Sequence, residues 1–226
     1  METIQSRSSV LVVLIWLGMT VVFITPVLSQ TTMLTLPDPQ TEGRMSLEQA
    51  IAQRRSLRDF RNEALTPQQI SQLLWAAQGI TGEGHGRRFR AAPSAGALYP
   101  IEVYAVKADG VFLYKPDEHA LEPWMSQDLR SQLSAVALNQ PWVAAAPVNL
   151  VFTAVHERVT RKYGQRGVRY SLIEVGHIAE NVHLQAVAMG LGSVPVGAFS
   201  DQEVRALLNL PPNQEPLYII SIGYPL

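Results

Sequence analysis

The chain has 226 residues, a length that suits one sizeable hydrophobic core and predicts a single folded domain. Its formal net charge of -1 gives no electrostatic indication of nucleic-acid binding. The sequence contains no cysteine, which excludes disulfides, thiolate nucleophiles, iron–sulfur clusters and cysteine-ligated zinc.

The first thirty residues have the composition of a targeting or anchoring segment. Residues 10–25 form an uncharged apolar run, and residues 26–29 include the small side chains that a signal peptidase accepts. The run is slightly long for a signal-peptide core and slightly short for a membrane span, so residues 1–29 fit either a cleaved signal or an uncleaved anchor. The charge bias places the amino terminus inside, which predicts an exported domain that meets a membrane only through this segment. Residues 30–45 are predicted to be a linker.

Capping signals predict two helices near the start of the folded domain, which we expect to span 46–226. A capping box at 46–49 begins a helix that runs to about Arg54. A second box at 66–69, with proline at the first helical position, begins a helix that Gly79 ends. Residues 82–89, with three alternating glycines, are predicted to be a loop.

The rest of the chain alternates between strands and helices. The dipeptide at 109–110, Asp-Gly, is a strong hairpin signal between two short apolar runs. The predicted elements are strands over 101–106 and 111–114, a helix over 128–138, a strand over 147–155, a long helix over 168–189, a strand over 193–199, a helix over 200–208 and a strand over 217–222. This mixture predicts an α+β fold in which a central mixed sheet is flanked by helices.

Residues 54–60 (RRSLRDF) form a dense basic heptapeptide at the end of the first predicted helix. Three guanidinium groups and a hydroxyl within five residues can bind an anion, because the rigid fork of arginine matches phosphate oxygens. Alternatively, these arginines are solvated and interact favourably with the helix macrodipole. The heptapeptide alone leaves both interpretations open.

Three other candidate sites are weaker. His177, Glu180 and His183 recur at i, i+3 and i+6, whereas a zinc-protease helix has two histidines four residues apart, so we do not predict a metal site. Ser94 lacks the G-x-S-x-G context of a hydrolase nucleophile, which leaves a hydrolase as a poorly supported alternative. The glycines at 190–192 lack the third glycine and the leading strand of a dinucleotide fingerprint.

Three stretches taken together resemble the nitroreductase-like flavoproteins, and most closely their SagB-type dehydrogenase branch, which includes azoline oxidases. They are the heptapeptide at 54–60, PSAGALYP at 93–100, and the segment that runs from EVGHIAEN at 174–181 to VGAF at 196–199. The resemblance implies a nitroreductase-like α+β fold, FMN held non-covalently between the two subunits of a homodimer, and hydride transfer through flavin N5. The apolar and small side chains of the long helix over 168–189 also predict a large apolar dimer interface.

The resemblance also implies roles for individual residues. Arg54 and Ser56, with Arg55 adjacent, match the residues that bind the FMN phosphate, and Arg58 matches a basic residue beside the pyrimidine edge of the flavin. Many relatives have a further basic residue after the final Gly-x-Pro, whereas Leu226 follows it here, so we expect phosphate binding to depend heavily on Arg54 and Ser56.

The other matched residues would surround the flavin ring. Those expected to line the ring or its tail are Pro93, Ser94, Ala95 and Gly96, and those whose backbone would approach N5 are Val196 and Gly197. Lys162 and Tyr163 match the pair that removes a proton in azoline oxidases, although a surface lysine beside a half-buried tyrosine would give the same sequence.

The sequence thus predicts an FMN-dependent oxidoreductase that acts on a small organic or peptide-derived substrate, with NAD(P)H as a candidate electron donor. The alternative is a flavin-fold protein that binds a ligand or partner without turnover.

Overall fold

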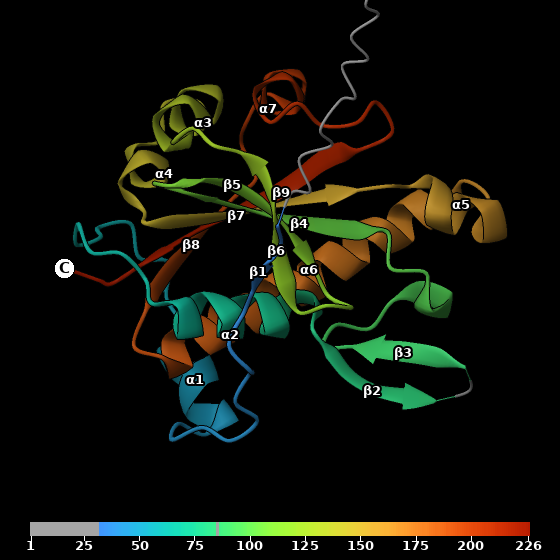
Figure 1. The fold of residues 1–226 in the computed structure, drawn as a ribbon, viewed down its shortest axis with the longest axis horizontal. Helices are drawn as coiled ribbons and strands as arrows, with labels where there is room; N and C mark the ends of the chain where they lie inside the picture. The colour runs from blue at the N-terminus through green and yellow to red at the C-terminus, as the bar shows by residue number, and fades with distance from the viewer. Residues whose placement is uncertain (1–31, 85) are drawn as a thin grey trace, which may run out of the picture. The chain divides into compact units, whose positions relative to one another are not determined.

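The computed structural model describes residues 32–84 and 86–226, and the predicted targeting segment lies outside these ranges. A seven-stranded sheet forms the centre of the described part, with strand order β1-β6-β5-β4-β7-β9-β8 (Figure 1). The strands are β1 (Leu34–Thr35), β4 (Ile101–Lys107), β5 (Gly110–Lys115), β6 (Ala120–Met125), β7 (Val148–Ala154), β8 (Gly192–Val196) and β9 (Glu215–Gly223). Each neighbouring pair is antiparallel, so the α+β fold is confirmed with an antiparallel sheet in place of the expected mixed one.

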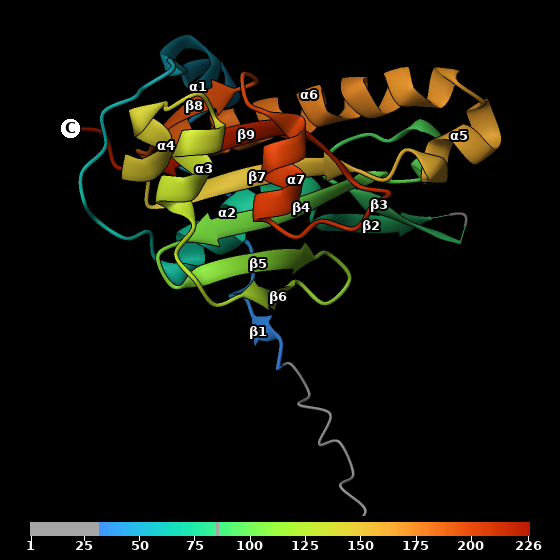
Figure 2. The same ribbon diagram turned by 90° about the horizontal axis from the view of Figure 1, so that it is seen from above.

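Helices cover both faces of this sheet (Figures 1 and 2). They are α1 (Leu47–Gln53), α2 (Pro67–Gln78), α3 (Arg130–Val136), α4 (Pro141–Ala145), α5 (Glu157–Tyr163), α6 (Arg166–Ala188) and α7 (Asp201–Leu207), with a short 3-10 turn η1 (Ala95–Ala97). The α2 and α6 side chains share one hydrophobic core with the sheet, and those of α3, α4 and α7 share a second core on its other face.

Strand β4 shows how one sheet serves two cores. Its side chains alternate between faces, so Val103 and Ala105 join the α2–α6 core while Tyr104 and Val106 join the α3–α4–α7 core. All four side chains are at most 2% exposed. Burying one large apolar side chain contributes roughly 1.5–3 kcal/mol, so the two-sided burial of the central strands fixes their register.

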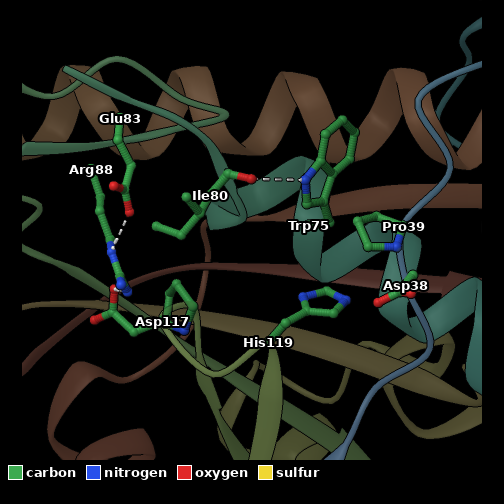
Figure 3. Close-up of a pocket in the computed structure, with 9 residues that line it drawn as sticks. Asp38, Pro39, Trp75, Ile80, Glu83, Arg88, Asp117 and His119 are labelled. Carbon is green, nitrogen blue, oxygen red and sulfur yellow. Dashed lines mark hydrogen bonds and ion pairs between the residues drawn. The ribbon is translucent and has the colours of Figure 1, made fainter.

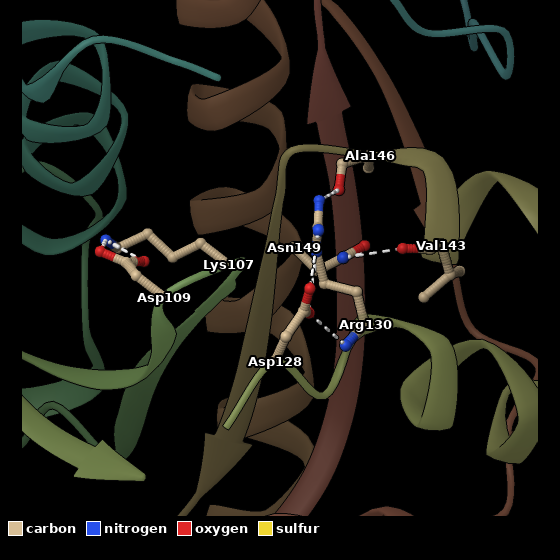
Figure 4. A network of polar contacts seen from close by, with 7 residues as sticks. All are labelled: Lys107, Asp109, Asp128, Arg130, Val143, Ala146 and Asn149. Atoms are coloured by element: carbon tan, nitrogen blue, oxygen red, sulfur yellow. Dashed lines mark hydrogen bonds and ion pairs between the residues drawn. The ribbon is translucent and has the colours of Figure 1, made fainter. Parts of the chain in front are cut away.

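Polar contacts hold the short helices α3 and α4 against the sheet (Figure 4). Arg130, at the start of α3, pairs with Asp128 at 2.7 Å and donates from Nη1 to the Ala146 carbonyl at 3.3 Å. The buried Asn149 side chain of β7 donates to the Val143 carbonyl of α4 at 2.9 Å. These contacts satisfy backbone carbonyls at the end of α4 that the helix itself leaves unpaired.

The predicted helix starts and the main strands are confirmed. Both capping boxes form, with Ser46 accepting from the Gln49 amide and Thr66 from the Gln69 amide. Much of the segment expected to be a loop instead pairs as an antiparallel hairpin of β2 (Ile80–Gly84) and β3 (Arg87–Arg90). The loop prediction was wrong because the alternating glycines suggested a flexible connection, whereas the segments on either side of the turn pair with each other as strands. The sequence also gave no sign of β6, α4 or α5.

The segment predicted as a linker is attached to the domain along part of its length. Leu34 and Thr35 pair with β6. Further along, the Gln72 side chain accepts from the Gln40 amide at 2.8 Å and donates to the Gln40 carbonyl at 2.9 Å. Among the described helices, none is long and apolar enough to cross a membrane.

We predict different costs for removing the two helix caps. Thr66→Ala should lower the free energy of unfolding by about 1 kcal/mol, because α2 is packed in the core and loses its first hydrogen bond. Ser46→Ala is the matched control, since α1 buries only Ala50 and its fraying should cost less. Urea unfolding of both variants measures the difference, and a larger loss for Ser46→Ala would contradict it.

Candidate functional site

The basic heptapeptide is threaded between β8 and the carboxyl-terminal residues. At one end the Leu57 amide donates to the Ser193 carbonyl at 3.0 Å, and Ser56 forms a parallel bridge with Ser193. Just beyond the other end the Arg61 amide donates to the Tyr224 carbonyl at 2.9 Å. The heptapeptide therefore has a fixed path although it forms no helix or strand of its own.

Two glycines make this close packing feasible. A Cβ atom at Gly192 would lie 3.1 Å from the Leu57 Cβ, and one at Gly223 would lie 3.0 Å from the Phe60 ring and 2.6 Å from Pro147. The buried Phe60 ring is thus held against backbone that has no side chain. Its burial anchors the polar residues before it.

The three arginines of the heptapeptide point to different partners. Arg54 is half-buried, and its Nε lies 4.0 Å from Glu180 Oε1 of α6. Arg55 instead donates to the Ala52 and Arg54 carbonyls at 3.0 and 2.7 Å, so it caps the end of α1. Arg58 lies over the Trp142 ring at 5.1 Å. We call Arg54, Ser56 and Arg58 the arginine cluster.

His183 lies behind the arginine cluster. Its ring is 5% exposed, and Nδ1 is 2.7 Å from the Ser193 hydroxyl. Burial, aided by the positive charge of Arg54, lowers the pKa of His183 to about 4. The imidazole is therefore neutral near pH 7, and Arg54 carries the charge in this region.

Strand β8 leads from the arginine cluster to Val196 and Gly197. Ser193, which bridges to Ser56, precedes Val196 by three residues, a separation of roughly 10 Å at about 3.3 Å per residue. Val196 is buried, whereas a Cβ atom at Gly197 would meet only the Tyr218 ring, at 3.7 Å. The backbone at Gly197 is open to close approach.

A second cluster gathers around residues 93–99, which we call the Gly96 loop. A Cβ atom at Gly96 would lie 2.8 Å from Tyr163 Oη and 3.0 Å from Lys162 Nζ, so the loop and the predicted proton-transfer pair are in contact. Arg87 also donates to the Gly96 carbonyl at 3.1 Å. The structure thus brings Pro93, Ser94, Ala95 and Gly96 together with Lys162 and Tyr163.

The two clusters do not meet within one chain. The arginine cluster borders α6 at Glu180, whereas Lys162 and Tyr163 belong to α5, before α6 begins. Eighteen residues separate Lys162 from Glu180, and Figures 1 and 2 both place α1 and α5 at opposite ends of α6. Tyr163 packs against Tyr170, ten residues before Glu180, so helix geometry at about 1.5 Å per residue places the two clusters roughly 15 Å apart along α6.

The structure adds residues that sequence reasoning missed. Trp142 supports Arg58, and buried Glu174 lies beneath the Gly96 loop. Trp142 gave no signal because it comes from an unpredicted helix. Glu174 stood within a matched stretch, and an acidic residue on the apolar face of a helix could have been noticed.

Two hollows in the described part of the chain lie elsewhere. One, of about 320 Å³, is at the base of the β2–β3 hairpin, where Arg88 lies 3.0 Å from Glu83 and faces Asp117 (Figure 3). The other, of about 930 Å³, lies between residues 40–47 and helices α2 and α6. Neither hollow is lined by a residue of the arginine cluster or by Gly96.

Comparison with known proteins agrees with this arrangement. The model of the nitroreductase family matches residues 51–224. The chain belongs to the nitroreductase family. It is 39% identical over 202 residues to a provisionally named nitroreductase of Methanocaldococcus jannaschii, covering 87% of this chain and 98% of the relative.

Two further relatives place the chain within the nitroreductase family. The crystal structure of a provisionally named nitroreductase from Ralstonia eutropha superposes with a TM-score of 0.77 at 33% identity, over 86% of this chain and 90% of that one. The microcin B17-processing protein McbC of Escherichia coli is 31% identical over 157 residues, 62% of this chain and 55% of McbC. Both relatives fit the nitroreductase-like superfamily, and the similarity to McbC fits its SagB-like branch.

We predict that His183 makes the protein acid-sensitive. Because its pKa is lowered, its contribution to stability is present above about pH 6.5 and is lost as the pH falls towards 4. A pKa depression of this size corresponds to a loss of roughly 3 kcal/mol in the free energy of unfolding between pH 7 and pH 4. His183→Gln should therefore lose less stability between pH 7 and 4, measured by urea unfolding, and parallel curves for the two proteins would contradict this.

Proposed function

We propose that this chain is an FMN-dependent oxidoreductase that transfers hydride to or from a small organic or peptide-derived substrate. The main support for this proposal is that a group of positively charged residues and an exposed glycine lie at the two ends of one strand, β8. Ser56, beside Arg54, bridges to the start of β8, and Gly197 follows its end. This order matches a cofactor with an anionic tail and a flat ring.

The residues present fit FMN. Arg54 is two-thirds buried, and its contact with Glu180 is long at 4.0 Å, which leaves its guanidinium available to a phosphate together with the Ser56 hydroxyl. Arg58 is held over Trp142 and would place a positive charge near the pyrimidine edge of the ring. Bound FMN would supply the hydride-accepting and hydride-donating chemistry, with Val196 and Gly197 beside its ring.

A homodimer would complete this site. The Lys162–Tyr163 pair and the arginine cluster contact different turns of α6, at Tyr170 and Glu180, so a second copy would bring one cluster to the other. The surface of α6 supports this, because Leu172 and Ile173 are 51% and 49% exposed beside Gly176. The small side chains of the long helix were expected to lie at the dimer interface, but Ala179 and Ala186 pack in the core of their own subunit and do not support a dimer.

Lys162 and Tyr163 are the candidates for proton transfer. Their polar atoms meet at Gly96, on the loop expected to line the ring, and Lys162 Nζ lies 5.2 Å from the centre of the Tyr163 ring. Tyr163 packs edge-on against Tyr170 at 5.2 Å, which orients its hydroxyl. NAD(P)H is the proposed electron donor. A flavin absorbance spectrum of the purified protein tests whether FMN is bound. Photoreduction followed by reoxidation then distinguishes an enzyme that turns over from a protein that only binds flavin.

We predict that Arg54, and not its neighbour Arg55, determines FMN affinity. Arg54→Ala should weaken binding about ten- to a hundredfold, because a charge-assisted hydrogen bond contributes roughly 1.5–3 kcal/mol. Arg55→Ala is the matched control, since its guanidinium is engaged with carbonyls of α1. Titration of each apoprotein with FMN, followed by flavin fluorescence, measures this.

Arg58→Ala is a third variant to be titrated with FMN in the same way. It should change affinity less and lower the flavin reduction potential, because its proposed partner is the ring. Equal affinities for wild type and Arg54→Ala would remove the arginine cluster as the phosphate site.

We predict that a charge at Gly176 separates the subunits. Gly176→Arg should shift the dimer towards monomer at micromolar concentration without unfolding it, because a Cβ atom there meets nothing within 4 Å. The matched control is Gln202→Arg, an exposed position of α7 on the other face of the sheet. Light scattering of the wild type as a stable monomer would refute the dimer.

A further inference from the structure

Glu174 is a buried acid that the proposed reaction does not use. Its side chain projects from α6 towards the Gly96 loop and is 2% exposed. Oε1 is 3.5 Å from Gln78 Nε2, the limit of a hydrogen bond, and Oε2 has no hydrogen-bond partner among the described residues. An ionised carboxylate accepts only, so its unpaired buried oxygen favours the neutral acid.

The loop above Glu174 is strained. Gly96, Ala97 and Tyr99 have φ angles of 66°, 53° and 46°, and two of these residues carry a Cβ atom. Such conformations cost of order 1–3 kcal/mol each for residues other than glycine and persist only where surrounding contacts impose them. The shape of the Gly96 loop therefore depends on its neighbours.

Two arginines and a serine supply those contacts. Arg158 Nη1 donates to the Tyr99 carbonyl at 2.9 Å, and the Arg90 guanidinium lies 4.4 Å from the centre of the Tyr99 ring. Ser94 Oγ accepts from the Tyr99 amide at 2.9 Å and keeps a lone pair for a second donor. All three contacts converge on Tyr99.

The same two arginines are the positive charges that act on Glu174. Burial raises the pKa of Glu174 to about 7, against the opposing effects of Ser94, Gln78, Arg90 and Arg158. Other charged or titratable groups also face this loop: Lys162 and Tyr163 meet Gly96, and Arg87 donates to its carbonyl. Glu102 binds Arg158, and His156 Nδ1 is 3.0 Å from Ser171, one turn back along α6.

We propose that Glu174 is a positioning residue for the Gly96 loop. Its neutral carboxyl leaves Arg90 and Arg158 on Tyr99, whereas its carboxylate competes for both guanidinium groups and releases the loop. In the neutral state the carboxyl proton can be donated to Ser94 Oγ, which supports the turn from below. The effect of Glu174 on the loop is inferred from these contacts alone. Only the effect of Glu174 on turnover rests on the proposed function.

Hydrogen exchange of the apoprotein tests the loop. If the carboxyl regains its usual pKa when the loop opens, the opening equilibrium should rise about tenfold between pH 6 and 8. We expect this rise, after correction for intrinsic exchange, in the peptide that contains residues 93–99. Glu174→Gln, which keeps the shape and both hydrogen-bonding roles of the neutral acid, should abolish it.

Two controls make the outcome decisive. His156→Asn, which removes the neighbouring titratable group, should keep the pH dependence of the wild type. Glu174→Leu should open the loop at every pH, because it fills the space but donates nothing to Ser94. A pH-independent wild-type loop, or the same tenfold rise in Glu174→Gln, would overturn the proposal.

The FMN-loaded protein supplies a separate readout. Its kcat/KM should fall above about pH 7 in the wild type and stay level in Glu174→Gln. If exchange responds as expected but no flavin is bound, the loop mechanism stands and the proposed function fails. If flavin is reduced normally but hydrogen exchange of the loop is the same in the wild type and Glu174→Gln, the proposed function stands and this inference fails.

Discussion

The burial of α6 against the sheet is the constraint on which both candidate clusters depend. Ile178, Val182 and Ala186 are fully buried on one side of this helix, where they meet β4, β7 and β9 in the first core. Side chains three and four residues apart share a face, so this contact fixes the rotation of the whole helix. It turns Glu174 and His183 inward and leaves Ile173 and Gly176 outward.

The two clusters are nevertheless held by different forces. The arginine cluster is positioned by close backbone packing, in which Phe60 fits against Gly223 and Leu57 against Gly192. The Gly96 loop is positioned by polar contacts that converge on Tyr99 and compensate for strained backbone. Apolar packing is insensitive to pH, whereas a set of contacts with charged groups responds to any proton gained or lost nearby. The two halves of the proposed site are therefore expected to respond to pH through different groups, His183 behind the arginine cluster and Glu174 beneath the Gly96 loop.

The sequence predicted what local signals and motifs encode. The capping boxes located α1 and α2, the Asp-Gly turn located the β4–β5 hairpin, and the heptapeptide drew attention to Arg54, Ser56 and Arg58. Local sequence signals do not predict contacts between segments that are distant in the chain. Nothing local indicates that Arg55 turns back onto α1 while Arg58 meets Trp142, since the second contact spans 84 residues. The same limit hid the meeting of Glu174 with Ser94 and Gln78.

Electrostatics links these observations at the arginine cluster. Arg54 lies near Glu180, at 4.0 Å, and disfavours the protonated form of His183. Because His183 stays neutral, Arg54 faces one exposed carboxylate and no additional positive charge from the histidine behind it. An anion proposed to bind here would compete only with the long, solvent-screened contact between Arg54 and Glu180, a pairing that is weak at an exposed surface. The buried histidine thus adds no charge of its own, and the anion binding proposed for the cluster would depend on Arg54 together with the hydroxyl of Ser56.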